Sequence, residues 1–267
     1  MMAMTGRQCW PGAPGIVRLV GEEREVTVGG IRLAYQVSGA PDAAPMLLLH
    51  ALGEQGTTWT PVTARLAERY RVFALDLRGH GSSDWPGTYS FQLMRDDVVG
   101  LLEQLGLREV TLVGHSMGGT VAYLVAMARP DQVDRLIIED VPPPFPRERA
   151  IPGRPAGPLD FDWPVVPAIV SQVNKGDPAA WDHLDTITAP TLLIGGGPQS
   201  HIPQDRRAAV AARIPSCELV AIPAGHHVHT TLQRSSPPPC SDGSPADGLT
   251  DAKTTASGTT ARQGPRL

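Results

Sequence analysis

The sequence predicts an α/β protein in which short strands alternate with helices around a largely parallel sheet. Three observations predict this fold class. Short apolar runs are typical of strands buried on both faces, the segments between them have helical spacing, and the two kinds of segment alternate along the chain. With 267 residues, the chain is long enough to bury one core without dividing into two domains.

The predicted elements follow one another in a regular order. A turn at Gly29-Gly30 joins the first two strands into a hairpin, because glycine accepts the positive φ angles of a tight turn. Ser90 is a typical N-cap and begins a helix that ends before Gly106. Helices are predicted at residues 58–70, 90–105 and 120–129. Strands are predicted at residues 25–28, 31–37, 46–49, 72–75, 110–113, 135–139, 191–194 and 218–222.

Three segments lie outside this pattern and set the domain boundaries. Residues 1–21 are rich in Gly, Pro and Met and are interpreted as a flexible extension, which leaves one domain at 22–233. Residues 141–186 are rich in proline and too long for a plain connection, so they predict a short cap over the candidate site. Residues 234–267 contain no Val, Ile, Phe, Tyr, Trp or Met, so they bury too little apolar surface to fold and are predicted to be disordered.

The composition excludes several classes of protein. A net charge of -4 gives no electrostatic attraction to nucleic acid, so a small molecule is the expected partner. The three cysteines have no C-x-x-C spacing, which argues against a zinc site and gives no disulfide framework. No signal peptide and no apolar stretch long enough to span a bilayer are visible, so we expect a cytoplasmic monomer or homodimer without membrane contact.

The segment Gly114-His115-Ser116-Met117-Gly118-Gly119 is the strongest candidate for a chemical site. It follows the apolar run 110–113 and precedes the helix at 120–129. Only glycine tolerates the crowding on either side of a serine in so tight a strand-to-helix turn. Such a turn lifts the Ser116 hydroxyl clear of the sheet, which makes it a candidate nucleophile.

The nucleophile needs a base, and His226 is the best candidate. It follows the last predicted strand, and Gly225 before it lets a loop turn the imidazole back over the sheet edge. A histidine-rich surface loop is one alternative. A metal cluster with His227 and His229 is another, but no carboxylate or cysteine accompanies them in the sequence. We therefore expect no metal ion and no cofactor.

Together these motifs resemble serine hydrolases of the α/β-hydrolase superfamily. The resemblance covers about residues 25–229 and is specific for the superfamily rather than for a substrate. It implies an α/β-hydrolase fold with helices on both faces of the sheet. It further implies that Ser116 is the nucleophile and that the N–H groups of Met117 and Leu52 form the oxyanion hole. Ala51 stands where relatives usually carry glycine. The matching segments are His50-Ala51-Leu52-Gly53 with Trp59, Asp76 to Ser83, Gly114 to Gly119, and Gly225-His226.

The acidic partner of His226 departs from the family pattern. Gln199 occupies the place after the penultimate strand where most relatives have aspartate, and an amide cannot stabilise imidazolium by charge. Asp140, which follows the strand at 135–139, is favoured instead, although it could merely cap the turn into the proline-rich segment. Asp205 is the weaker alternative, because it is expected to open a helix. The loop at 76–83 is interpreted as structural, with its charges paired locally.

The expected activity is hydrolysis of a carboxylic ester or lactone through an acyl-enzyme. Carbon–carbon bond hydrolysis, amide cleavage and perhydrolysis are alternatives on the same fold, and a non-catalytic small-molecule-binding protein is an alternative of another class. The resemblance implies that epoxide hydrolase or dehalogenase chemistry would need aspartate at position 116. We expect His50, Phe145 and Trp163 to line a pocket for a small to medium apolar substrate.

The chain also departs from the family near residue 230. Relatives follow the catalytic histidine with an amphipathic helix, whereas here a proline-rich and serine-rich stretch begins at once. We hypothesise a frameshift or an abnormal terminus at this point. Without that helix, apolar surface would be exposed, which predicts lower stability or self-association.

Overall fold

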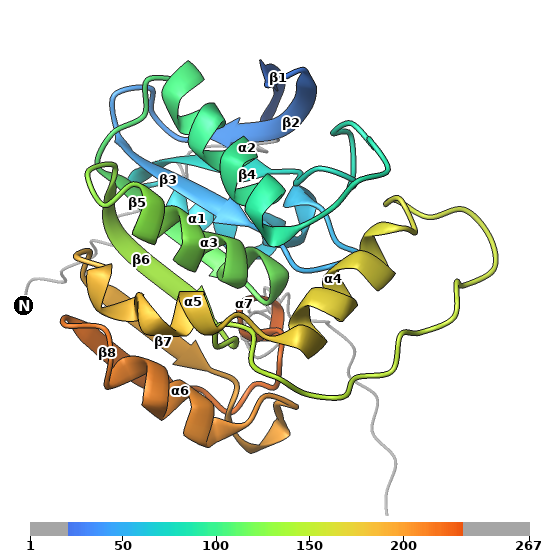
Figure 1. Cartoon of the computed structure of the whole chain (residues 1–267). Helices are drawn as coiled ribbons and strands as arrows, with labels where there is room; N and C mark the ends of the chain where they lie inside the picture. Colours follow the sequence, from blue (N-terminus) through green and yellow to red (C-terminus); the bar gives the residue numbers. More distant parts are fainter. Residues whose placement is uncertain (1–20, 232–267) are drawn as a thin grey trace, which may run out of the picture. The chain divides into compact units, whose positions relative to one another are not determined.

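The computed structural model describes residues 21–231, which form an eight-stranded sheet in the order β1-β2-β4-β3-β5-β6-β7-β8 (Figure 1). The hairpin strands β1 and β2 are antiparallel, β2 is also antiparallel to β4, and the other neighbours are parallel. The predicted fold class is therefore confirmed. The strands are β1 (Glu22–Val28), β2 (Ile31–Ser38), β3 (Ala44–Leu49), β4 (Tyr70–Leu75), β5 (Val110–His115), β6 (Val133–Glu139), β7 (Thr191–Gly195) and β8 (Cys217–Ala221).

The helices connect these strands. The Ser90 side chain accepts a hydrogen bond from the Leu93 N–H (3.0 Å) and so forms the predicted N-cap. The helix predicted at 58–70 ends earlier, because the chain from Tyr70 onward pairs with β3 as part of β4. The helices are η1 (Gly56–Trp59), α1 (Thr60–Leu66), α2 (Phe91–Gln104), α3 (Met117–Ala128), α4 (Val165–Lys175), α5 (Pro178–Asp182), η2 (Leu184–Thr186), η3 (Gly197–Gln199), α6 (Gln204–Ala211) and α7 (Val228–Thr231).

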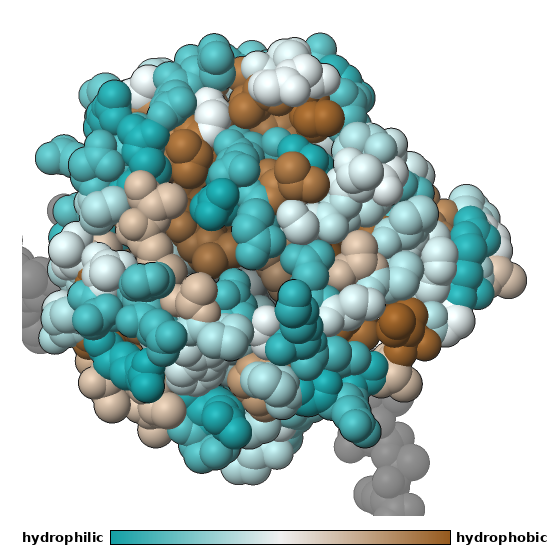
Figure 2. Space-filling model, in the orientation of Figure 1, coloured by the Kyte–Doolittle hydropathy of each residue, from teal (hydrophilic) through white to brown (hydrophobic). Residues whose placement is uncertain are grey.

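Helices cover both faces of the sheet, and each face has its own apolar core. The larger core joins the sheet to α2, α3, α4 and α6, and a smaller one lies beneath α1 around Trp59. Figure 1 shows α2, α3, α5 and α6 in front of the sheet and α1 behind it. In the same orientation, apolar residues reach the surface in small patches between hydrophilic ones (Figure 2). Such scattered patches are ordinary for a folded domain.

The face that carries α1 is left partly open over the last strands. Ile137 and Leu192 lie next to each other in register on this face, alongside the buried Val113 under α1. Within residues 21–231 this region is a shallow hollow lined by residues 135–137, 190–192 and 216–218. Three predictions fall on residues that lie outside the described ones. They are the absence of an amphipathic helix after residue 230, the disordered tail at 234–267, and the flexible extension at 1–21 apart from Gly21.

The cap connects β6 to β7, as predicted. Residues 141–164 cross the carboxyl edge of the sheet without forming a helix, and α4, α5 and η2 follow. Ile169 and Val170 of α4 are buried against the main core, so the helical part of the cap is packed on the domain. No helix in residues 21–231 is both long enough and apolar enough to cross a membrane.

Candidate active site

Ser116 occupies a strained turn between β5 and α3. Its φ angle of 50° lies in the left-handed region, which non-glycine residues rarely adopt. The two flanking glycines permit this turn. A Cβ atom at Gly114 would collide with the carbonyl of Gly118, and one at Gly118 would collide with the carbonyl of Leu49. The Ser116 side chain is half-buried and lines a cavity at the carboxyl edge of the sheet.

Two backbone N–H groups beside Ser116 have no acceptor in the part of the chain that the structure describes. Leu52 and Met117 line the same cavity as Ser116, and neither N–H donates a hydrogen bond to another described residue. Met117 begins α3, so its N–H also lies at the positive end of a helix dipole. Free donors fixed at the start of a helix suit an oxygen that gains negative charge.

His226 forms a hydrogen bond with Asp140 and lies beside the serine turn. Its Nδ1 is 2.8 Å from Oδ2 of Asp140, which leaves Nε2 for a second partner. The ring centre of His226 lies 4.6 Å from that of His115, the residue before Ser116. Among the described residues no hydrogen bond joins the Ser116 hydroxyl to His226. Hydrogen bonds between catalytic groups are often long or poorly aligned before substrate binds.

Asp140 is fully buried and hydrogen-bonded through both oxygens. Burial alone would raise its pKa, but hydrogen bonds from His226, Ser200 and the Gly196 N–H (2.7 Å), with the charge of Arg207, lower the pKa below its ordinary value. Its φ angle of 52° is a second left-handed backbone conformation in this site. The carboxylate therefore stays ionised and holds the imidazole in one orientation.

Sequence reasoning missed two partners of Asp140. The Ser200 hydroxyl donates to Oδ2, and the buried Arg207 guanidinium of α6 pairs with Oδ1. Ser200 follows Gln199, the position at which most relatives have an aspartate. The family pattern therefore indicated that this segment lies near the catalytic acid. Nothing in the local sequence marks Arg207, because the fold brings it to Asp140 from 67 residues away.

Three residues predicted to line the substrate pocket do not line it. His50 is completely buried, where Nδ1 bonds the Ala51 carbonyl (2.7 Å) and Nε2 accepts from the Leu77 N–H (3.0 Å). Phe145 packs beneath Arg206 at another surface hollow, and Trp163 packs near Phe161. The cavity around Ser116 is instead lined by Leu52, Phe91, Met117, Thr120, Val141, Arg147, Arg149, Ile169, Val170, Val173, His201 and Ile202.

The loop at 76–83 has structural contacts, but its charges are not paired locally. The Asp76 carboxylate accepts from the backbone N–H groups of Gly56 (2.6 Å) and Ser82 (2.9 Å). Arg78 forms a buried ion pair with Asp97 of α2 instead of pairing within the loop. The predicted local pairing is therefore wrong for Arg78. These contacts hold the loop to η1 and α2.

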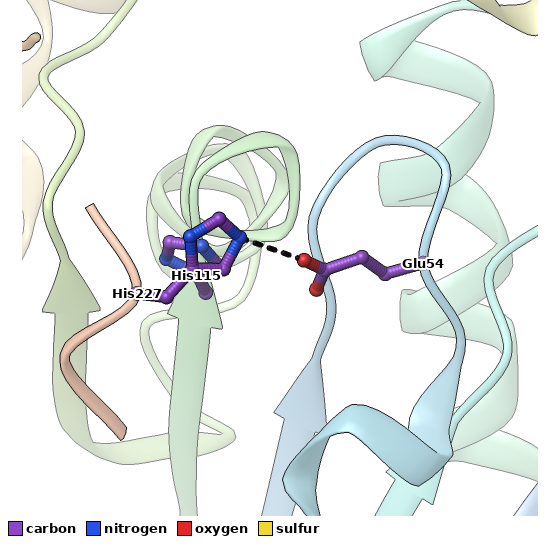
Figure 3. A group of neighbouring side chains, drawn as sticks. All are labelled: Glu54, His115 and His227. Atoms are coloured by element: carbon purple, nitrogen blue, oxygen red, sulfur yellow. Dashed lines mark hydrogen bonds and ion pairs between the residues drawn. The ribbon is translucent and has the colours of Figure 1, made fainter. Parts of the chain in front are cut away.

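A carboxylate accompanies each of the three histidines that follow the last strand, although none is near them in the sequence: besides Asp140 at His226, these are Glu54 at His227 and Glu139 at His229. Glu139 accepts from Nδ1 of His229 (2.8 Å) and from the Val228 N–H (2.7 Å), which holds α7 against β6. Oε1 of Glu54 lies 3.0 Å from Nε2 of His227 (Figure 3). In the folded chain these histidines therefore have the carboxylate neighbours that a metal site needs, although the sequence shows none beside them.

Comparison with known proteins gives one family match, an uncharacterised protein and several hydrolases. Residues 44–162 match a family model described as the alpha/beta hydrolase fold. An uncharacterised protein of Mycobacterium tuberculosis is 45% identical over 113 residues, which is 42% of this chain and 33% of that protein. Epoxide hydrolase 4 of Mus musculus is 36% identical over 43% of this chain and 33% of its own length. The match thus spans about a third of these relatives. The sn-1-specific diacylglycerol lipase ABHD11 of Mus musculus is 26% identical, covering 74% of this chain and 80% of the lipase.

Solved structures agree in fold. A thioesterase domain from the curacin biosynthetic pathway superposes with a TM-score of 0.72 at 22% identity and covers 81% of this chain and 97% of that domain. An enol-lactonase from Burkholderia xenovorans has a TM-score of 0.69 at 20% identity, with 79% and 97% covered. The sheet order, the strained serine turn and the family match over residues 44–162 have one explanation: the chain has the α/β-hydrolase fold.

Proposed function

We propose that this protein is a serine hydrolase that cleaves a carboxylic ester or lactone through an acyl-enzyme. The observation that carries the proposal is the strained Ser116 turn, which lies beside a cavity lined by two residues whose N–H groups have no acceptor within residues 21–231. In the proposed reaction the Ser116 hydroxyl attacks the substrate carbonyl while His226 takes its proton. The oxygen that becomes negative accepts from the Leu52 and Met117 N–H groups.

The second half of the proposed reaction uses the same groups. His226 returns the proton to the leaving alcohol oxygen, then activates a water molecule that attacks the acyl-enzyme. Asp140, kept ionised by its hydrogen bonds, stabilises the imidazolium at each step. The serine at position 116 favours this route over that of the epoxide hydrolase relative, because epoxide opening in this superfamily would need a carboxylate there.

The cavity favours a compact acyl group and a substrate with a negative charge. Its volume is about 40 Å³ in this conformation, so a substrate must displace cap side chains to enter. Apolar residues form most of the wall, but Arg147 and Arg149 also line it, and no described lining residue is acidic. Nε of Arg147 is buried without a partner among the described residues. A carboxylate or phosphate on the substrate would supply that partner.

A fluorophosphonate probe tests the nucleophile directly. We expect the folded protein to gain one covalent adduct at Ser116 by mass spectrometry and to lose ester hydrolysis in parallel. Ser116→Ala should remain unlabelled, and Ser216→Ala, which removes an exposed serine, should react as the wild type does. If the folded wild type stays unlabelled and turns over no ester or lactone, the enzyme proposal fails and non-catalytic binding replaces it.

A further inference from the structure

Three potential metal ligands converge next to the candidate base from three distant parts of the chain. Glu54 follows β3, His115 ends β5, and His227 lies in the loop after β8 (Figure 3). Oε1 of Glu54 is 3.0 Å from Nε2 of His227, and one donor atom from each of the three residues lies within 4.8 Å of the others. Two imidazoles and one carboxylate are a ligand set that suits zinc.

An unpaired nitrogen on His115 gives independent support for a ligand at this place. The His115 side chain is completely buried, and its Nε2 has no hydrogen-bond partner among the described residues. Its Nδ1 faces Glu139, at 3.4 Å from the carbonyl oxygen and 3.5 Å from Oε1. A buried nitrogen without a partner costs free energy, and a metal ion bound to its lone pair would remove that cost.

We propose that Glu54, His115 and His227 bind a divalent transition-metal ion, with Zn²⁺ as the best fit. Tetrahedral zinc with bonds of about 2.0–2.2 Å places its ligand atoms about 3.4 Å apart, so the present arrangement needs shifts on the order of 1 Å. The His227 side chain is 50% exposed and can make them. That exposure also gives the ion access from solvent and leaves a fourth position for water.

The other possible ligand group is already occupied by protein contacts. His229 and Glu139 also lie near His115 and could form a second cluster. However, Glu139 accepts hydrogen bonds from His229 Nδ1 and from the N–H groups of Val228 and His229, and the His229 side chain is buried. Metal binding there would break the contacts that hold α7. Within the described residues, the side chains of Glu54 and His227 hold no helix in place: they bond each other at 3.0 Å, and Glu54 otherwise accepts only a long contact of 3.4 Å from the Ala51 N–H.

The ion would inhibit the hydrolase, and this consequence rests on the proposed function. The ring centre of His226 is 4.6 Å from that of His115 and 5.3 Å from that of His227. An ion held by these two neighbours would fix the loop that carries His226, so the imidazole could not move freely toward Ser116. We therefore expect reversible inhibition by Zn²⁺ that a chelator relieves.

Equilibrium dialysis of the full chain with Zn²⁺ tests the site without reference to activity. We expect one bound ion per chain, no comparable binding of Mg²⁺, and a Zn²⁺ affinity at least about tenfold lower in Glu54→Gln and in His227→Ala. The matched control is His183→Ala, which removes an exposed histidine elsewhere and should bind as the wild type does. Circular dichroism and thermal unfolding check that each variant is folded.

The possible failures are distinguishable. If the wild type binds no Zn²⁺, or if both variants bind it unchanged, the metal site is wrong. Binding that survives in both variants but disappears in His226→Ala would place the ion on the candidate base and would also overturn the proposal. Stoichiometric Zn²⁺ binding that depends on Glu54 and His227, in a protein without esterase activity, would support the metal site and reject the proposed function alone.

Discussion

Two residues of the candidate site have backbone conformations that local sequence preferences oppose. Ser116 and Asp140 both have positive φ angles, at 50° and 52°. The surrounding structure stabilises both backbone conformations. The flanking glycines allow the turn at Ser116, whereas four hydrogen-bonding groups and the burial of its side chain hold Asp140. Strain of this kind persists only where many contacts oppose its release, and it is typical of functional sites.

Asp140→Asn should lower kcat by at least about 10²-fold, because an amide cannot stabilise the imidazolium of His226. Ester turnover with a neutral substrate measures the effect. Ser200→Ala is the matched control: it removes one hydrogen bond to Oδ2 but keeps the charge, so its loss should be much smaller. Equal losses in the two variants would show that Asp140 acts through the hydrogen-bond network and not through its charge.

Arg207→Met should destabilise the fold by about 3–5 kcal/mol, because it leaves the buried Asp140 carboxylate without its ion-pair partner. Urea unfolding at neutral pH measures the change. Arg206→Met, one position earlier on the exposed side of α6, should change the free energy of unfolding by less than about 1 kcal/mol. A similar small change in both variants would contradict the structural role of the Arg207 pair.

At the scale of elements, the candidate base depends on how one short segment is attached. His226 lies in the loop between β8 and α7, and Glu139 at the end of β6 holds the start of α7. The ring of His229 also stacks on Trp59 at 4.1 Å, which joins α7 to η1. Helix α7, the last described element, thus contacts both β6 and η1, although it is only four residues long.

Glu139→Gln should loosen this attachment, because it weakens the charge-assisted acceptor for His229 and Val228. We expect faster limited proteolysis near residues 226–231 and a kcat about tenfold lower at nearly constant KM. Glu103→Gln, at an exposed carboxylate of α2, is the control for a simple loss of charge. Unchanged proteolysis together with unchanged kcat would remove Glu139 as a positioning residue.

Arg149→Gln should lower kcat/KM by about tenfold for an ester that carries a carboxylate near the scissile bond, with little effect on a neutral ester of the same shape. The reason is that the cap arginines are the charged groups lining the cavity in the described structure. Arg154→Gln, an exposed cap arginine outside the cavity, is the matched control. If Arg149→Gln affects both esters equally, the cap does not select for charge.

At the scale of the whole molecule, neutral buried histidines make stability depend on pH. Burial lowers the pKa of His50 to about 4 and that of His80 to about 3. The unfolded chain, with an ordinary histidine pKa of about 6.5, therefore binds protons that the folded chain does not. The stability that both rings share at neutral pH is complete above pH 6.5, and it falls as pH drops toward 4 for His50 and toward 3 for His80.

Urea unfolding between pH 7.5 and 4.5 should show this loss, of up to about 3 kcal/mol for His50. His50→Gln should be less stable than the wild type at pH 7 and should show a shallower fall in stability below pH 6.5. His183→Gln, at an exposed position, should keep the slope of the wild type. Parallel slopes in the wild type and His50→Gln would show that His50 does not contribute to the pH dependence.

The sequence by itself determined the fold class, the positions of the strands along the chain and the serine turn, because these depend on neighbouring residues: apolar runs, helical spacing and glycines around Ser116. It also led to Asp140 and His226, which the structure brings within 2.8 Å of each other. Only the tertiary structure decided what surrounds them. Arg207, the cap arginines, and the carboxylates beside His227 and His229 are distant along the chain, and His50 could not be placed in the core by local pattern. Contacts of this kind are set by how the sheet and cap pack, which no short stretch of sequence encodes.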